Sequence, residues 1–193
     1  MFVLTVDQRD SRRDVDRVAD LLTDLRDAPL LRPFERTAGD EIQAVTDDPV
    51  VVVDLVLDLL RREHWSIGVG VGPVEHPLPE QTRAGRGRAF EHARSAVERA
   101  KNAPGRVAVD GADSDAAGDA DAALTLLATL VLRRSAQGHE AVDLAREGLS
   151  QAGIAERLGI SRQAVSQRLT TAAWQAEVAG RELARRLLER ADR

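Results

Sequence analysis

Cysteine is missing from the 193-residue chain. Disulfide bonds, thiolate zinc sites and cysteine nucleophiles are therefore excluded, and a reducing compartment is compatible with this composition. No apolar stretch approaches the ~20 residues that a membrane-spanning helix needs, and the N-terminal apolar run ends at Asp7. We therefore expect a cytoplasmic protein that is neither exported nor anchored in a membrane.

Positive charge is scarce as well. The chain has 27 Lys and Arg against 32 Asp and Glu, a formal net charge of −5, and a single lysine, Lys101. For a nucleic-acid partner, the distribution of charge matters more than its sum. Residues 1–110 and 111–149 are net acidic, whereas residues 150–193 carry 8 basic and 5 acidic side chains. A nucleic-acid contact is therefore expected in the C-terminal segment.

Hydrophobic patterns over the first 110 residues alternate between strands and helices. They predict strands at 2–6, 34–37, 42–45, 65–72 and 106–109, and helices from Ser11 (as N-cap) to about 25, at 49–63 and at 89–101. This order, with its central hairpin, is typical of a ferredoxin-like α/β sandwich. The strand at 65–72 has Gly or Ser at every second position, and such a bare face lets a helix backbone approach closely. A dinucleotide fingerprint would need a different glycine spacing.

A small, acidic stretch at 111–118 predicts a linker, and everything beyond it is predicted helical. The fold class is therefore α+β, with a sandwich at 1–112 followed by an all-α domain at 119–193. The strongly apolar helix at 122–134 is expected between the domains or in a dimer seam.

Residues 149–170 hold the most specific pattern in the chain. Ala155 is small enough for a second helix to cross against it, and Gly159 suits a left-handed turn residue. Ser161 is a good N-cap for that second helix. Over about 22 residues the segment resembles the helix-turn-helix of bacterial regulators and of the promoter-reading segment of sigma factors.

The start of the second helix carries side chains that can read DNA. Arginine can reach the two acceptors of guanine, and glutamine can pair with adenine. A helix pair with a merely solvated polar face is the alternative. The residues expected to contact double-stranded DNA are Ser150, Gln151, Ser161, Arg162, Gln163, Ser166, Gln167 and Arg168.

The last helix runs on from Trp174 with apolar positions at three- and four-residue spacing and interspersed arginines. Such a helix is typical of a dimer or domain-packing element. A homodimer would place two recognition helices about 34 Å apart, as adjacent major grooves require.

Four stretches in the N-terminal part, 7–12, 38–43, 65–70 and 86–90, follow one another on the expected elements. Through them, residues 1–110 resemble the SatD-like family and, more distantly, the palm-type catalytic domains of class III nucleotide cyclases and GGDEF-type dinucleotide synthases. In the palm enzymes, acids at the first strand end and in the hairpin turn share two magnesium ions. The resemblance therefore implies a magnesium site at Asp7, Asp40 and Glu41, with Asp10 nearby.

The sequence also departs from an active palm enzyme. The turn reads Ala-Gly-Asp-Glu-Ile at 38–42, polar residues follow Asp7, and no lysine lies where it would hold a phosphate. No catalytic residue is therefore assigned. The domain is expected to bind a nucleotide or cyclic dinucleotide, with unliganded strand-end acids as the alternative.

Three arginines, Arg83, Arg86 and Arg88, crowd the start of the third helix, where the helix dipole disfavours cations. A bound phosphate would relieve this repulsion. Arg94, further along the helix, could take the role of the missing lysine. Pairing with Glu80, with Glu91 or with the acidic first helix is the alternative explanation.

Three functions are compatible with these patterns. The preferred one is a DNA-binding transcriptional regulator whose N-terminal domain is a sensor or dimerisation module and binds a nucleotide or cyclic dinucleotide as effector. The second is an active magnesium-dependent nucleotidyl cyclase or dinucleotide synthase with a DNA-binding tail. The third is an assembly protein with a helical tail.

Overall fold

A five-stranded mixed sheet forms the centre of the computed structural model, which describes residues 1–9, 11 and 15–193. Its strands are β1 (Phe2–Gln8), β2 (Arg32–Arg36), β3 (Glu41–Thr46), β4 (Trp65–Val71) and β5 (Val107–Asp110). They lie in the order β2-β3-β1-β4-β5, with β4 and β5 parallel and the other neighbours antiparallel. Together with the helices, this confirms the predicted α+β class and the predicted order of elements up to β5.

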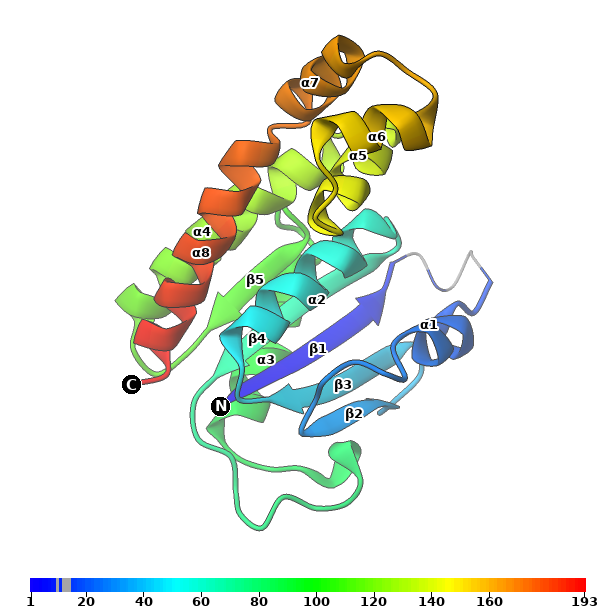
Figure 1. Cartoon of the computed structure of the whole chain (residues 1–193). Helices are drawn as coiled ribbons and strands as arrows, with labels where there is room; N and C mark the ends of the chain where they lie inside the picture. The colour runs from blue at the N-terminus through cyan, green and yellow to red at the C-terminus, as the bar shows by residue number, and fades with distance from the viewer. Residues whose placement is uncertain (10, 12–14) are drawn as a thin grey trace.

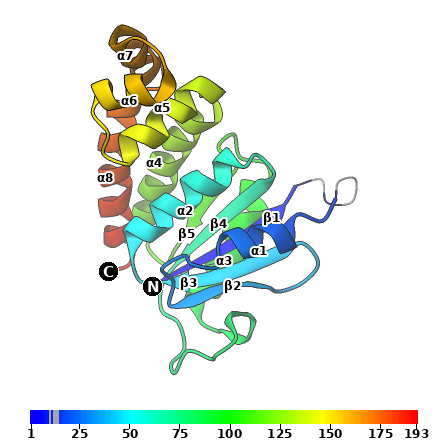
Figure 2. The same cartoon turned by 45° about the vertical axis from the view of Figure 1, so that its right-hand side comes forward.

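Helices cover both faces of the sheet (Figure 1, Figure 2). One face carries α1 (Val18–Asp24) and α2 (Pro49–Arg61), and the other carries α3 (Arg88–Ala100). The alternation of β1 explains the two layers. Phe2 and Leu4 point into the core beneath α2, whereas Val3 packs with the residues of α3.

The bare face of β4 lies against α3. A Cβ atom at Gly68 would lie 2.3 Å from the backbone nitrogen of Val97, and one at Gly70 would lie 2.0 Å from the carbonyl oxygen of Ala89. No side chain fits in that space. The prediction that these glycines admit a helix backbone is therefore confirmed.

The start of α1 differs from the prediction. The helix begins at Val18 with Arg17 at the N-cap, so the prediction of Ser11 as the cap was wrong. The physical reason is the buried side chain of Gln8, which donates from Nε2 to the Val15 carbonyl (2.7 Å) and accepts from the Arg17 amide (2.9 Å). These bonds hold the chain before Val18 outside a helix.

Helix α4 (Ser114–Leu132) takes up most of the predicted linker. The Asp113 carboxylate caps it by accepting from the Asp115 and Ala116 amides, at 3.0 and 2.9 Å. The prediction of a linker through 118 was therefore wrong, because this cap and the alanines that follow favour a helix from Ser114 on.

The hydrophobic core beside the sheet extends into helices that follow the predicted linker. Leu124 of α4 and Leu188 of α8 (Trp174–Ala191) are fully buried in the same cluster as α2 and the sheet. Figure 1 shows α4 and α8 side by side beyond α2. The apolar helix α4 thus packs within this chain, and the division of the chain into two domains stays a prediction.

A second, smaller core lies at the end of the molecule away from the N- and C-termini (Figure 1). Its helices are α5 (Ala136–Arg146), α6 (Gln151–Leu158) and α7 (Arg162–Thr171). Within the described ranges, no helix combines the length and the apolar character that crossing a membrane requires.

Candidate nucleic-acid interface

Helices α6 and α7, joined by the turn from Gly159 to Ser161, form a helix-turn-helix. Gly159 ends α6 in the left-handed conformation (φ 65°), and the Ile160 amide donates to the carbonyl of Ala155 over 3.1 Å. These are features of a helix end closed by a left-handed glycine. Ser161 then begins α7, accepting from the Ala164 amide at 3.1 Å. The helix-turn-helix predicted at 149–170 is confirmed.

The core beneath these helices consists of small and branched side chains. Ile154 and Val165 are fully buried, and Ala155 and Leu169 are each 8% exposed. A larger side chain at Ala155 would separate the two helices. This packing agrees with the prediction that Ala155 is small so that the second helix can cross against it.

One face of α7 consists of polar, solvent-exposed side chains. Because residues four apart lie on the same face of a helix, these positions form one stripe, next to the buried Val165 and Leu169. The stripe, called here the α7 face, comprises Arg162, Gln163, Ser166, Gln167 and Thr170. Thr170 was not among the predicted residues, although it lies four residues after Ser166 and therefore on the same face of the helix.

The other predicted DNA-binding residues lie around this face. The exposed hydroxyl of Ser150 caps α6 and accepts from the Gly153 amide at 3.2 Å. Gln151, Ser166 and Trp174 line a hollow of about 210 Å³. Arg168 turns to the opposite flank, where Nη1 lies 3.1 Å from a carboxylate oxygen of Glu140.

On that flank, a groove of about 400 Å³ separates α7 from the start of α5. Arg133, Gln167 and Arg168 line it, together with Ser135, whose hydroxyl caps α5. Arg133 is exposed and was missed by the sequence analysis, because no local pattern distinguishes it from other arginines after a helix. The groove therefore adds positive charge next to the α7 face.

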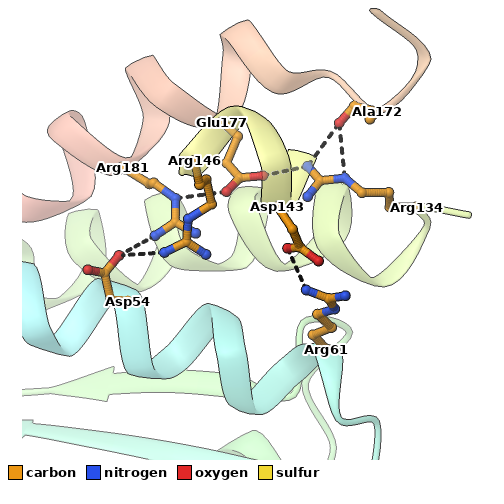
Figure 3. A network of polar contacts seen from close by, with 8 residues as sticks. All are labelled: Asp54, Arg61, Arg134, Asp143, Arg146, Ala172, Glu177 and Arg181. Atoms are coloured by element: carbon orange, nitrogen blue, oxygen red, sulfur yellow. Dashed lines mark hydrogen bonds and ion pairs between the residues drawn. The ribbon is translucent and has the colours of Figure 1, made fainter. Parts of the chain in front are cut away.

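The helix-turn-helix is joined to the rest of the molecule by buried charges (Figure 3). Arg134, which follows α4, donates from Nη2 to Glu177 of α8 at 2.5 Å and to the carbonyl of Ala172 at 2.9 Å. The side chains of Arg134 and Glu177 are only 3% and 1% exposed. This pair therefore fixes the end of α7 against α4 and α8.

The same network reaches α2 (Figure 3). Arg181 binds Glu177 at 2.8 Å and Asp54 of α2 at 2.5 Å, and Arg146 of α5 approaches Asp54 at 3.4 Å. Burial alone raises the pKa of Glu177, but the hydrogen bonds from Arg134 and Arg181 outweigh it and hold that pKa below its ordinary value. We call Asp54, Arg134, Glu177 and Arg181 the junction network.

One of the predicted metal ligands, Asp7, forms an ion pair with a lysine. Asp7 pairs across the β1/β3 register with Glu41, and its carboxylate lies 3.3 Å from Nζ of Lys101 at the end of α3. The pKa of Asp7 is raised above its ordinary value, chiefly by burial. The ammonium of Lys101 partly opposes this shift, whereas the nearby carboxylates of Asp40 and Glu41 add to it. The sequence did not predict Lys101 at this site, because its contact with Asp7 depends on how α3 packs against the sheet.

A cluster of three or more acids or histidines arranged to hold a metal does not occur among residues 1–9, 11 and 15–193. Asp10, which the resemblance also placed near this site, lies outside the described residues. The magnesium site at Asp7, Asp40 and Glu41 therefore stays a prediction.

The four arginines predicted to hold a ligand separate into two groups. Arg83, Arg86 and Arg94 border a single pocket, whereas Arg88 pairs with Glu91 at 3.0 Å and does not line it. The alternative explanation of pairing with Glu91 thus applies to Arg88.

In a comparison with known families, residues 129–173 match the family Sigma-70, region 4. The segment runs from the end of α4 through α7 and contains the whole helix-turn-helix. It indicates a DNA-binding helix-turn-helix and is consistent with transcription regulation. Neither the curated proteins nor the solved structures give a significant match. The resemblance of residues 1–110 to SatD-like and palm-type domains therefore stays a prediction.

Proposed function

We propose that this protein is a transcriptional regulator that inserts α7 into the major groove of double-stranded DNA. The observation that carries the proposal is the α7 face, a stripe of exposed polar side chains within the segment that matches Sigma-70, region 4. A recognition helix contacts base edges through its N-terminal residues. Arg162 and Gln163, at the start of α7, are therefore the proposed base-reading residues.

Phosphate contacts are proposed on both sides of α7. The exposed hydroxyls and helix-start amides at Ser150 and Ser161 suit backbone phosphates, because helix N-termini attract anions. Arg133 and Arg168 would add two cations from the flanking groove. Such contacts fix the register of the protein on the duplex without reading its sequence.

The N-terminal half is proposed to be a palm-type sensor of a nucleotide. The strand order supports a ferredoxin-like arrangement: β3 lies between β1 and β2, and β1 lies between β3 and β4, so the crossovers through α1 and α2 each span one strand. The ion pair between Asp7 and Lys101 disfavours the alternative of an active magnesium-dependent cyclase or synthase, because the ammonium already compensates the carboxylate.

We also propose that the regulator acts as a homodimer, as two adjacent major grooves would require. In support, α8 leaves the apolar side chains of Val178 and Leu183 about half exposed, at 45% and 46%. Light scattering after size-exclusion chromatography tests this. A mass near 21.0 kDa at all concentrations would show a monomer instead.

The test of DNA binding starts with sequences selected from a random DNA pool by the full chain. Fluorescence anisotropy then measures their affinity at several salt concentrations, where log K should fall by about 0.9 per phosphate neutralised for each unit of log salt. Arg162→Ala should lower the affinity about 5- to 150-fold. Arg186→Ala removes the same charge from an exposed position on α8 and should change the affinity little. Failure to select any sequence, or equal losses in both variants, would refute the proposed role of α7.

A further inference from the structure

The long connection between β4 and α3 lies against the hairpin edge of the sheet, at the bottom of Figure 1. It contains one short 3-10 helix, η1 (Thr82–Ala84). Arg32 of β2 donates to the carbonyls of Pro79 (2.5 Å) and Leu78 (2.8 Å), and the hydroxyl of Thr82 donates to the Pro33 carbonyl at 2.7 Å. These bonds attach the connection to β2 and fix its position.

A pocket of about 520 Å³ lies between this connection and α3. Three arginines border it, Arg83 from η1, Arg86 from the residues after it, and Arg94 from α3. Small-molecule sites in proteins have volumes of about 300–1,000 Å³. The pocket is therefore large enough for a ligand of nucleotide size.

The charges of these arginines are poorly compensated inside the molecule. In the part of the chain that the structure describes, Arg86 and Arg94 have no carboxylate within ion-pair distance. Arg83 donates from its side chain to the side-chain oxygen of Gln81, and its backbone amide donates to a carboxylate oxygen of Glu35 at 3.4 Å. Two acids, Glu75 and Glu91, also border the pocket, but Arg88 already pairs with Glu91. Gathering like charges around one cavity is unfavourable unless an anion binds between them.

An aromatic side chain borders the same pocket. A Cβ atom at Gly85 would lie 2.1 Å from the tip of the Phe90 ring, so the glycine allows the ring to lie against the loop backbone. Phe90 is partly exposed, and the side-chain amide of Gln43 borders the pocket from β3. Aromatic faces bind planar rings, and guanidinium groups bind phosphate through paired hydrogen bonds.

We propose that this pocket binds a small phosphorylated ligand with a planar ring, its phosphates at Arg83, Arg86 and Arg94 and its ring at Phe90. The pocket supplies a site for the sensing role proposed above, and only its influence on transcription rests on that proposed function. The ligand would bind away from the α7 face, so its affinity can be measured without DNA.

Isothermal titration calorimetry of the full chain tests the pocket with three probes: ATP, inorganic pyrophosphate and adenosine. We expect ATP to bind most tightly, pyrophosphate more weakly, and adenosine without detectable heat, because the guanidinium groups supply most of the attraction. Binding should weaken as salt increases. Absence of heat with both ATP and pyrophosphate at millimolar concentration would overturn the proposal.

Variants then locate the site. Arg86→Gln combined with Arg94→Gln should weaken ATP binding by about tenfold or more, since two charge-assisted contacts are lost. Arg26→Gln removes an exposed arginine that does not line the pocket and should leave the affinity within about twofold. Equal affinities in both variants would place the ligand elsewhere. Both side-chain sites are exposed, and circular dichroism melting will verify that the variants fold.

Two further variants separate the parts of the proposal. Phe90→Leu should weaken ATP binding about fivefold or more while leaving pyrophosphate binding unchanged, because a leucine side chain cannot stack on the base. No effect on ATP would refute the ring contact. Arg162→Ala should leave ATP binding intact and weaken DNA binding. A protein that binds ATP at this pocket but no DNA would refute the proposed function alone, and one that binds DNA but neither phosphate probe would refute this inference alone.

Discussion

The junction network, which connects α8 to α2 and to the residues after α4, and the α7 face both carry charged side chains, yet these charges are placed in opposite ways. In the network, the Arg134 and Glu177 side chains are 3% and 1% exposed and contact each other directly. On the α7 face, Arg162 and Gln163 are exposed, and Arg162 has no carboxylate partner among the described residues. One set of charges is bound within the fold, and the other is available to a ligand.

This difference shows how burial determines what a charge can do. A charged group removed from water must be paired within the protein, because the loss of hydration costs several kcal/mol per ion. Once paired, it can orient helices but cannot contact a partner. An exposed arginine keeps its hydration and its donors until a phosphate or base replaces the water.

The strongest test of this comparison breaks the network. Glu177→Ala leaves Arg134 buried without its carboxylate and should lower the free energy of unfolding by about 3–5 kcal/mol. Urea denaturation followed by circular dichroism measures the loss. Glu182→Ala, on the same helix, removes an exposed acid that pairs with Arg185 and should change the stability little. Similar losses in the two variants would show that burial does not distinguish them.

A second test removes a side chain from the α7 face. Gln163→Ala should weaken binding to the selected DNA by about 1–3 kcal/mol while leaving the free energy of unfolding nearly unchanged. Anisotropy titration and urea denaturation measure the two effects. Gln81→Ala removes an exposed glutamine from the connection between β4 and α3, at the other end of the molecule, and should affect neither. A stability loss in Gln163→Ala would mean that this side chain supports the fold.

The turn that presents α7 gives a smaller effect. Gly159 has φ 65°, and a Cβ atom added there would meet no atom within 4 Å, so Gly159→Ala should destabilise through backbone strain alone, by about 1–2 kcal/mol. Gly118→Ala is the control, because that glycine lies in α4 with equally open space and no positive φ, and alanine is favoured in a helix. Thermal denaturation of the two variants should show opposite shifts in Tm.

The smallest effect concerns pH. The pKa of Glu177 is held below its ordinary value of 4.5, so its contribution to stability is complete above that pH and is lost as the pH falls through the lower, folded value. Below pH 4.5, Glu177→Gln should therefore lose stability less steeply than the unmodified protein. Urea midpoints measured at successive pH values test this, and parallel curves would contradict it.

Local patterns in the sequence predicted the helix-turn-helix, because its caps, its left-handed glycine and its core all lie within one short segment. The order of strands and helices was predictable for the same reason, since each element has its own hydrophobic period. The start of α1 was missed because the buried amide of Gln8 determines it from outside the helix.

The junction network could not be predicted from the sequence. Arg134 and Glu177 are 43 residues apart, and Asp54 and Arg181 are 127 apart, so their contacts depend on how α2, α4 and α8 pack. The same holds for Lys101 beside Asp7. For the arginine pocket, the sequence indicated the residues but did not separate Arg88 from the other three, because the direction of each side chain depends on the fold of the connection to α3.

The break between α7 and α8 is very short. Ala173, with φ 54°, is the left-handed residue at the start of α8, which then continues without interruption to Leu188 in the core beside the sheet. Helix α8 thus connects α7 directly to the hydrophobic core beside the sheet. A shift of α8 within that core would therefore also move α7, the helix that we propose contacts DNA.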